Sequence, residues 1–179
     1  KYSLLSCFEK FERFLPLFKD LTNTPKLFIN IESQLALKNL DSILKLIEDE
    51  NLPVEKVVIG RSDLSKSLMI SDVDNEKMLQ ICIELLSKKR NLNFTLGGNL
   101  MSKSFSFIRN LSKKGLYAFE SRKCTFKTEV TLKKNDFNSL INSALEFELS
   151  WLNLKRSMYS LRSNEENARV NKIKNRLKL

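Results

Sequence analysis

The stretch Lys56-Val-Val-Ile-Gly-Arg-Ser-Asp-Leu-Ser-Lys66 decides the fold class of this chain. It begins with a short run of β-branched apolar residues that ends at Gly60, and it continues as a polar segment. A short, uninterrupted apolar run is typical of a strand buried on both faces of a parallel sheet. The sequence therefore predicts a buried strand over 56–60, with polar groups at its carboxyl end.

The segments on either side of this strand alternate between two patterns, short apolar runs and runs with helical spacing. The predicted strands cover 26–32, 56–60, 93–97 and 116–120, and the predicted helices cover 3–20, 35–49, 74–90 and 102–113. This alternation predicts an α/β fold with a parallel sheet, right-handed crossovers and covering helices. Two architectures fit: an open α/β sheet, or half of a (β/α)₈ barrel, whose complete form has ~250 residues. The phosphate-binding patterns GxGxxG and GxxxxGK[ST] are absent.

The last part of the chain has a different pattern. Residues 122–134 are predicted to be extended or irregular, and 136–160 to form a long amphipathic helix. Ser163-x-x-Glu166 is a capping signal that predicts a second helix after it. We therefore divide the chain into a sheet-forming region, 1–134, and a C-terminal helical extension, 135–179. The apolar face of the extension is expected to contact a neighbouring subunit of a homo-oligomer, or alternatively the base of the same domain.

Composition excludes several kinds of chemistry. The 179 residues include no histidine, which excludes Ser-His-Asp triads, histidine bases and histidine metal ligands. The cysteines Cys7, Cys82 and Cys124 form no CxxC pair, so we expect no zinc site, and scattered thiols indicate a reducing, cytoplasmic location. No apolar run reaches the ~20 residues that span a membrane.

The net charge of +10, from 31 basic and 21 acidic residues, comes entirely from the region after residue 100. In the tail, Val170, Ile173 and Leu177 recur at helical spacing between basic residues, which is typical of a helix with a solvated basic face. We therefore do not expect nucleic acid as a partner. A non-catalytic basic module for binding or assembly remains an alternative function.

Candidate functional residues lie at or just after the end of each predicted strand, where parallel α/β proteins place their functional groups. They are Glu32, Asp63, Gly97-Gly98-Asn99, Glu120 and Arg122. If the first two strands are neighbours ~5 Å apart, the carboxylates of Glu32 and Asp63 converge. Two carboxylates with waters and a substrate oxygen suit Mg²⁺ or Mn²⁺. The alternative is that each acid caps the next helix, although Ser33 is a better cap than Glu32.

Several of these motifs together resemble one known family. Phe28-Ile-Asn-Ile-Glu32 and Val57-Val-Ile-Gly-Arg-Ser-Asp-Leu-Ser65 resemble strands five and six of the HpcH/HpaI aldolase and citrate lyase β-subunit family. Leu96-Gly-Gly98 and Phe119-Glu-Ser-Arg-Lys123 resemble strands seven and eight of a divergent branch, whose strand eight ends in ETRK. The helix over 144–155 is similar to the C-terminal helix of that branch. The resemblance extends from about residue 26 to the end.

This resemblance implies the C-terminal half of a (β/α)₈ TIM barrel, strands five to eight, plus two C-terminal helices. It implies a divalent-metal-dependent carbon–carbon bond lyase or aldolase that acts on a small molecule through the enolate of a 2-oxo acid or an acyl-CoA thioester. Glu32 and Asp63 then correspond to the carboxylate ligands of Mg²⁺ or Mn²⁺. Strands one to four, with the catalytic arginine and the acid–base residues, are expected before Lys1, so this fragment is expected to be inactive alone.

The remaining site residues have two interpretations each. Arg61 stands where the family has small residues, and it either binds a substrate carboxylate or phosphate or pairs with a neighbouring acid. Glu120 and Arg122 either form an ion pair that closes the barrel or line the substrate pocket together with Gly97 and Gly98. Asn99 either donates a hydrogen bond to substrate or caps a helix, and Cys124 is either an activated or a plain structural thiol. Another phosphoenolpyruvate or 2-oxo-acid enzyme with a TIM barrel is an alternative to the lyase.

Overall fold

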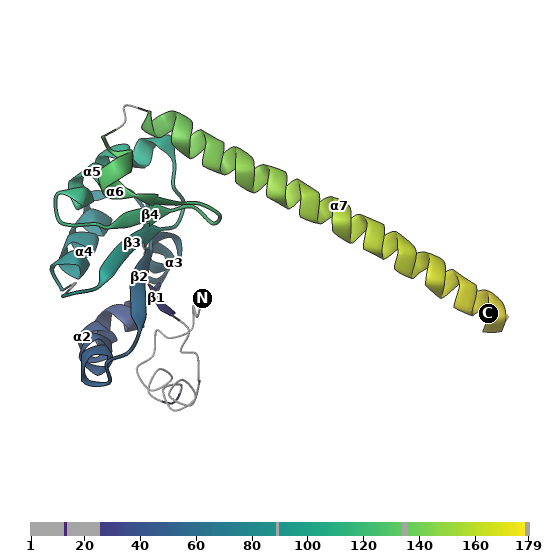
Figure 1. The fold of residues 1–179 in the computed structure, drawn as a ribbon, viewed down its shortest axis with the longest axis horizontal. Coiled ribbons are helices and arrows are strands. Elements are labelled where there is room, and N and C mark those ends of the chain that lie inside the picture. Colours follow the sequence, from purple (N-terminus) through teal and green to yellow (C-terminus); the bar gives the residue numbers. More distant parts are fainter. Residues whose placement is uncertain (1–12, 14–25, 89, 134–135, 178–179) are drawn as a thin grey trace.

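The computed structural model describes residues 13, 26–88, 90–133 and 136–177 (Figure 1). The helix expected over 3–20 lies, except for residue 13, outside the described residues. The strands are β1 (Leu27–Ile31), β2 (Val54–Gly60), β3 (Asn93–Gly97), β4 (Ala118–Glu120) and β5 (Thr125–Lys127). The helices are α2 (Gln34–Asp49), α3 (Arg61–Ser67), α4 (Glu76–Ser87), α5 (Phe105–Ser112), α6 (Thr128–Thr131) and α7 (Phe137–Leu177), with a 3₁₀ turn, η1 (Ser102–Ser104), before α5.

The five strands form one sheet in the order β1-β2-β3-β4-β5. The first four are parallel, which confirms the predicted α/β fold and all four predicted strands. β5 is antiparallel to β4. Among the described residues the sheet is open, with β1 at one edge and β5 at the other. The structure thus shows a mostly parallel five-stranded sheet, and closure into a barrel is not part of it.

The two faces of this sheet differ in chemistry because successive side chains of a strand point to opposite faces. One face carries the buried apolar residues Ile29, Ile31, Val57, Ile59, Phe94, Leu96 and Phe119, which belong to the main hydrophobic core. The second face carries Asn30, Lys56, Thr95 and Glu120 at the alternate positions. Since each strand pairs with the next one along the chain, right-handed crossovers place the connecting helices on one face only.

The helices α2, α4 and α5 lie together beside the sheet (Figure 1) and bury their apolar faces in the main core. In α2 the buried residues Leu40, Ile43, Leu44 and Ile47 follow the spacing of one helical face. Ser33 caps this helix, since its hydroxyl accepts a hydrogen bond from the Ala36 amide at 3.1 Å. The prediction that Ser33 rather than Glu32 caps α2 is therefore confirmed.

The segment 122–134 was expected to be extended or irregular; β5 is extended as expected, whereas the short helix α6 was not predicted. A tight turn joins β4 to β5: the Ser121 amide donates to the Cys124 carbonyl at 2.8 Å, and the Cys124 amide donates to the Ser121 hydroxyl at 3.1 Å. A three-residue strand is too short to show alternation in the sequence. The hairpin is therefore a product of pairing with β4.

The two expected C-terminal helices are one continuous helix, α7, which extends away from the rest of the fold (Figure 1). The prediction of a second helix starting at Ser163 was wrong. A cap needs the preceding helix to end, and no glycine or proline interrupts 137–177. Of the α7 side chains described, those of 137–174, only Phe137, Ile141 and Ala144, in the first turns, are buried. No helix among the described residues has the length and hydropathy needed to cross a membrane.

Candidate functional site

A cavity of about 770 Å³ lies at the carboxyl ends of the parallel strands. Seven of the residues singled out from the sequence line it: Glu32, Asp63, Gly97, Gly98, Asn99, Glu120 and Arg122. They come from the ends of four different strands, so they meet only because β1–β4 are parallel and adjacent. Arg61 does not line the cavity.

Glu32 lies over β2, and Gly60 makes room for it. A Cβ atom at Gly60 would stand 2.6 Å from Cγ of Glu32, well inside van der Waals contact. The Asn30 amide nitrogen donates a hydrogen bond to Oε1 of Glu32 at 2.8 Å. The glycine at the end of β2 therefore permits, and Asn30 helps to fix, the position of this carboxylate at the cavity.

Asp63 lies in the first turn of α3, the helix that starts directly after β2. Gly60, not Asp63, is the capping residue, so the interpretation of Asp63 as a helix cap was wrong. Its side chain is 63% exposed, and Oδ1 is 3.4 Å from Nζ of Lys66. An exposed pair of this kind contributes little to stability. Asp63 is therefore available to a ligand at the cavity.

The cavity offers oxygen donors of the kind that Mg²⁺ and Mn²⁺ prefer. Besides Glu32 and Asp63, its lining includes the hydroxyl of Ser62, the hydroxyl of Ser121 and the amide of Asn99. Within the described ranges no three His, Cys, Asp or Glu side chains gather into a metal cage. The donor set thus fits an ion held by two carboxylates that completes its shell with water and substrate oxygens.

Arg61 is completely buried beneath this site. Its guanidinium forms an ion pair with Asp74 and donates to the carbonyl of Gly98 at 2.8 Å and that of Gly97 at 3.4 Å. It also lies 4.9 Å from the ring centroid of Phe107. Burial lowers the pKa of Arg61, and the negative charge of Asp74 opposes that shift. The pairing interpretation is the one the structure shows, and the expected contact with a substrate anion is excluded by this burial.

The expected ion pair between Glu120 and Arg122 was wrong, because each residue pairs elsewhere. Lys56 Nζ lies 2.7 Å from Oε2 of Glu120, so this bridge crosses β3 on the second face of the sheet. Arg122, 85% exposed, has Nε 4.0 Å from Oε1 of Glu148 on α7. Both residues nevertheless line the cavity, as the alternative interpretation expected.

The loop after β3 approaches α3 closely. Gly98 has φ +86°, and a Cβ there would stand 2.6 Å from the amide nitrogen of Ser62. Asn99 also has a positive φ, 46°, and the following turn, η1, is capped by Met101. The interpretation of Asn99 as a helix cap was therefore wrong, and its side chain belongs to the cavity lining.

Several contributors to the site were not found from the sequence. Leu145 and Glu148 of α7 line the cavity, and Lys56 neutralises Glu120. These contacts join residues far apart along the chain, and no local pattern signals them. Of the two cysteines that the structure describes, neither lines the cavity: burial raises the pKa of Cys82 to about 12, and Cys124 is a half-buried free thiol.

No family model, curated protein or solved structure matches this chain. A functional assignment therefore depends on the geometry of the cavity and on the short motifs that surround it.

Proposed function

We propose that this chain is the C-terminal half of a (β/α)₈ enzyme, a divalent-metal-dependent carbon–carbon bond lyase or aldolase with a small-molecule substrate. One observation carries the proposal. The two carboxylates that the motifs single out as ligands, Glu32 and Asp63, line the same cavity at the carboxyl ends of adjacent parallel strands.

The sheet supports the barrel part of the proposal through its topology. Four parallel strands follow one another in chain order, and one face is apolar beneath helices. In a (β/α)₈ barrel the second face lines the interior, which suits Asn30, Lys56 and Thr95. β5 pairs with the edge of β4 over three residues only. In the complete barrel the first strand would pair with β4 in place of this hairpin.

Each residue of the cavity has a chemical role in this proposal. Glu32 and Asp63 would hold Mg²⁺ or Mn²⁺, which when bound polarises a substrate carbonyl as a Lewis acid. Lys56 balances the charge of Glu120, so that the second face does not accumulate uncompensated carboxylates. Arg122, largely exposed, is placed to attract an anionic substrate group. The proposal assigns the general base to barrel strands other than β1–β4.

The test is Mn²⁺ binding by the chain, followed through the loss of the free-ion electron paramagnetic resonance signal. We expect the Glu32→Gln and Asp63→Asn variants each to weaken binding at least about tenfold, because each removes one of two charged ligands. Asp49→Asn, at the exposed end of α2, is the matched control and should bind as the parent does. Equal binding by all four proteins would refute the site.

Metal binding alone does not separate a lyase from another phosphoenolpyruvate or 2-oxo-acid enzyme. Product analysis of the proposed complete barrel enzyme does so. The lyase proposal expects a 2-oxo acid or acyl-CoA thioester to be cleaved into two carbon fragments. A product with its carbon skeleton intact would favour the alternative.

A further inference from the structure

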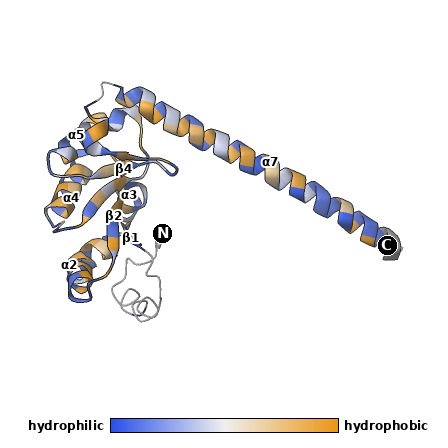
Figure 2. Ribbon diagram, viewed as in Figure 1, coloured by the Kyte–Doolittle hydropathy of each residue, from blue (hydrophilic) through white to orange (hydrophobic). Residues whose placement is uncertain are grey.

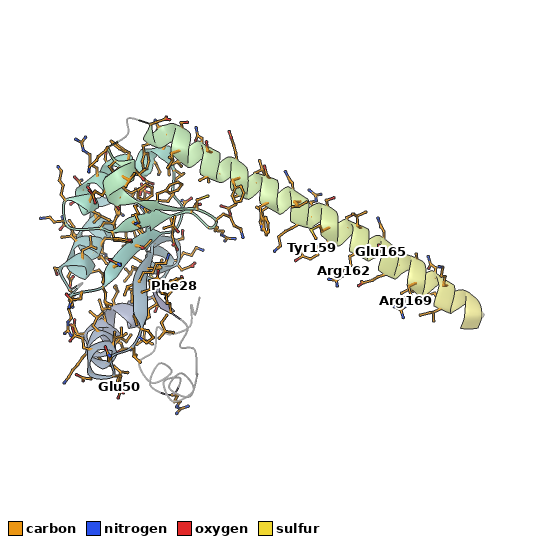
Figure 3. The ribbon with its side chains drawn as sticks, viewed as in Figure 1. Phe28, Glu50, Tyr159, Arg162, Glu165 and Arg169 are labelled. Atoms are coloured by element: carbon orange, nitrogen blue, oxygen red, sulfur yellow. The ribbon has the colours of Figure 1, made fainter. Side chains whose placement is uncertain are left out.

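Arg61 is a buried charge to which the proposed chemistry gives no role. Its side chain is completely buried at the start of α3, beside β2 and α4, which carry many hydrophobic positions (Figure 2). In Figure 3, by contrast, the charged side chains of Glu50, Arg162 and Arg169 project from the ribbon. A buried charge costs free energy unless hydrogen bonds and an opposite charge compensate it. The partners of Arg61 must supply that compensation.

The guanidinium of Arg61 joins two segments that line the cavity. Its Nε donates to the carbonyl of Gly97 at 3.4 Å and its Nη2 to that of Gly98 at 2.8 Å, in the loop after β3. Its Nη1 pairs with Asp74, in the segment before α4, and Asp74 also accepts a hydrogen bond from the Ser104 hydroxyl at 2.8 Å. Residues of both segments line the cavity. One side chain of α3 therefore ties two parts of the cavity wall together.

The loop after β3 also packs its backbone against the first turn of α3. A Cβ atom at Gly98 would stand 2.6 Å from the amide nitrogen of Ser62 and 3.1 Å from that of Arg61. The backbone of the loop thus touches the turn, while the Arg61 side chain, from the same turn, holds the carbonyls of the loop. Two such contacts form a closed ring in which neither segment can shift alone. Asp63 belongs to this turn, so the position of its carboxylate depends on the ring.

We propose that Arg61 is a positioning residue of the candidate site, which fixes the carboxylate of Asp63 against the loop that carries Asn99. The inference rests on the proposed metal site. Arginine suits this role because its planar guanidinium presents donors in a fixed fork, whereas the ammonium of lysine is a point charge. All three guanidinium nitrogens of Arg61 are used, each on a different acceptor. The ring of Phe107, with its centroid 4.9 Å from Cζ, supports the guanidinium further.

The variant Arg61→Lys tests this role, because it keeps a positive charge beside Asp74 but loses the fork. We expect its Mn²⁺ affinity, measured by electron paramagnetic resonance on the whole chain, to fall at least about tenfold, as it does when groups that orient metal ligands are lost. Ile43→Val is the control: Ile43 is equally buried, in α2, and does not line the cavity. It should bind Mn²⁺ as the parent does. Parent-like binding by Arg61→Lys, or an equal loss in the control, would overturn the proposal.

A second variant separates positioning from stability. Arg61→Met with Asp74→Leu removes both charges, so neither is left buried without its partner, and such apolar replacements of a buried pair often preserve the fold. Circular dichroism checks that the double variant is folded. We expect it to bind Mn²⁺ at least about tenfold more weakly than the parent, because nothing then holds the carbonyls of Gly97 and Gly98. A folded double variant with the Mn²⁺ affinity of the parent would mean that Arg61 has a structural role alone.

Hydrogen exchange of the backbone amides of Gly98 and Asn99 tests the same role without metal, since it measures local opening of the loop. We expect Arg61→Lys to raise these exchange rates at least about tenfold and Ile43→Val to leave them unchanged. If the parent chain does not bind Mn²⁺, the proposed metal site fails, and the exchange rates still decide the role of Arg61. Unchanged exchange at both amides in Arg61→Lys overturns the positioning role, whatever the result with Mn²⁺.

Discussion

Replacing Asp74 by alanine should destabilise this protein more than any other single loss of a carboxylate among the described residues. Asp74 forms an ion pair with the fully buried Arg61, and its other oxygen accepts a hydrogen bond from the Ser104 hydroxyl at 2.8 Å. Asp74→Ala removes the counter-charge and leaves the guanidinium buried with only carbonyl acceptors, those of Gly97 and Gly98.

The magnitude follows from the burial of both partners. Removing one member of a buried pair costs about 3–5 kcal/mol, because the remaining charge is uncompensated. That is a large share of the roughly 5–15 kcal/mol by which a domain is stable. Asp74→Asn keeps the shape and one acceptor oxygen, so we expect a smaller loss, about 1–3 kcal/mol. Asp41→Ala, the control, removes an exposed pair with Lys88 and should cost about 0–1 kcal/mol.

Urea unfolding followed by circular dichroism measures these differences through the midpoint of the transition. The expected order of stability is parent, Asp41→Ala, Asp74→Asn and Asp74→Ala. Since Arg61 also holds the carbonyls of Gly97 and Gly98, Asp74→Ala should loosen the loop that lines the cavity. If Asp74→Ala lowered the urea midpoint no more than Asp41→Ala does, the buried pair of Arg61 and Asp74 would not contribute to stability as its geometry indicates.

Three further predictions concern single residues. Gly98→Ala should cost about 1–3 kcal/mol in urea unfolding, since it adds a methyl group 2.6 Å from the Ser62 amide at a positive φ; an unchanged midpoint would contradict this contact. Gly60→Ala should weaken Mn²⁺ binding, because its Cβ displaces Glu32, and equal affinity would mean that the position of Glu32 is unimportant. Burial raises the pKa of Cys82 from 9.0 to about 12, so the folded state keeps a proton that the unfolded state loses. Its contribution to stability is therefore complete below pH 9.0 and falls as the pH rises toward about 12. Between pH 9.0 and about pH 12, the free energy of unfolding should therefore decline less steeply with pH in Cys82→Ala than in the parent.

Much of the candidate site was predictable because it follows a general rule of α/β folds. Once the apolar runs ending at Ile31 and Gly60 are identified as strands, the residues after them must lie at one edge of the sheet. Glu32 and Asp63 could be selected in this way from the sequence. The same rule selected Gly97, Gly98 and Asn99 after β3, and all five residues line the cavity.

The rule does not give the direction of a side chain. Arg61 lies between cavity residues in the sequence, yet it points into the protein to reach Asp74 and the Gly97 carbonyl. Glu120 pairs with Lys56, 64 positions away, rather than with its sequence neighbour Arg122. These choices depend on which distant groups reach the same volume, and local periodicity contains no such information.

The sequence by itself determined the elements of this protein, because helices and strands require a periodicity that neighbouring residues supply. It determined β1 to β4, the helices α2, α4 and α5 between them, and the edge of the sheet where the polar residues gather; it did not determine α3. The absence of glycine and proline over 137–177 is also a property of the sequence, and it allows α7 to continue unbroken. Only the tertiary structure decided the β4–β5 hairpin and the burial of Arg61. Each of these depends on contacts between distant residues. The free energy of such contacts comes from packing and charge pairing across the fold, which the order of residues along one segment does not specify.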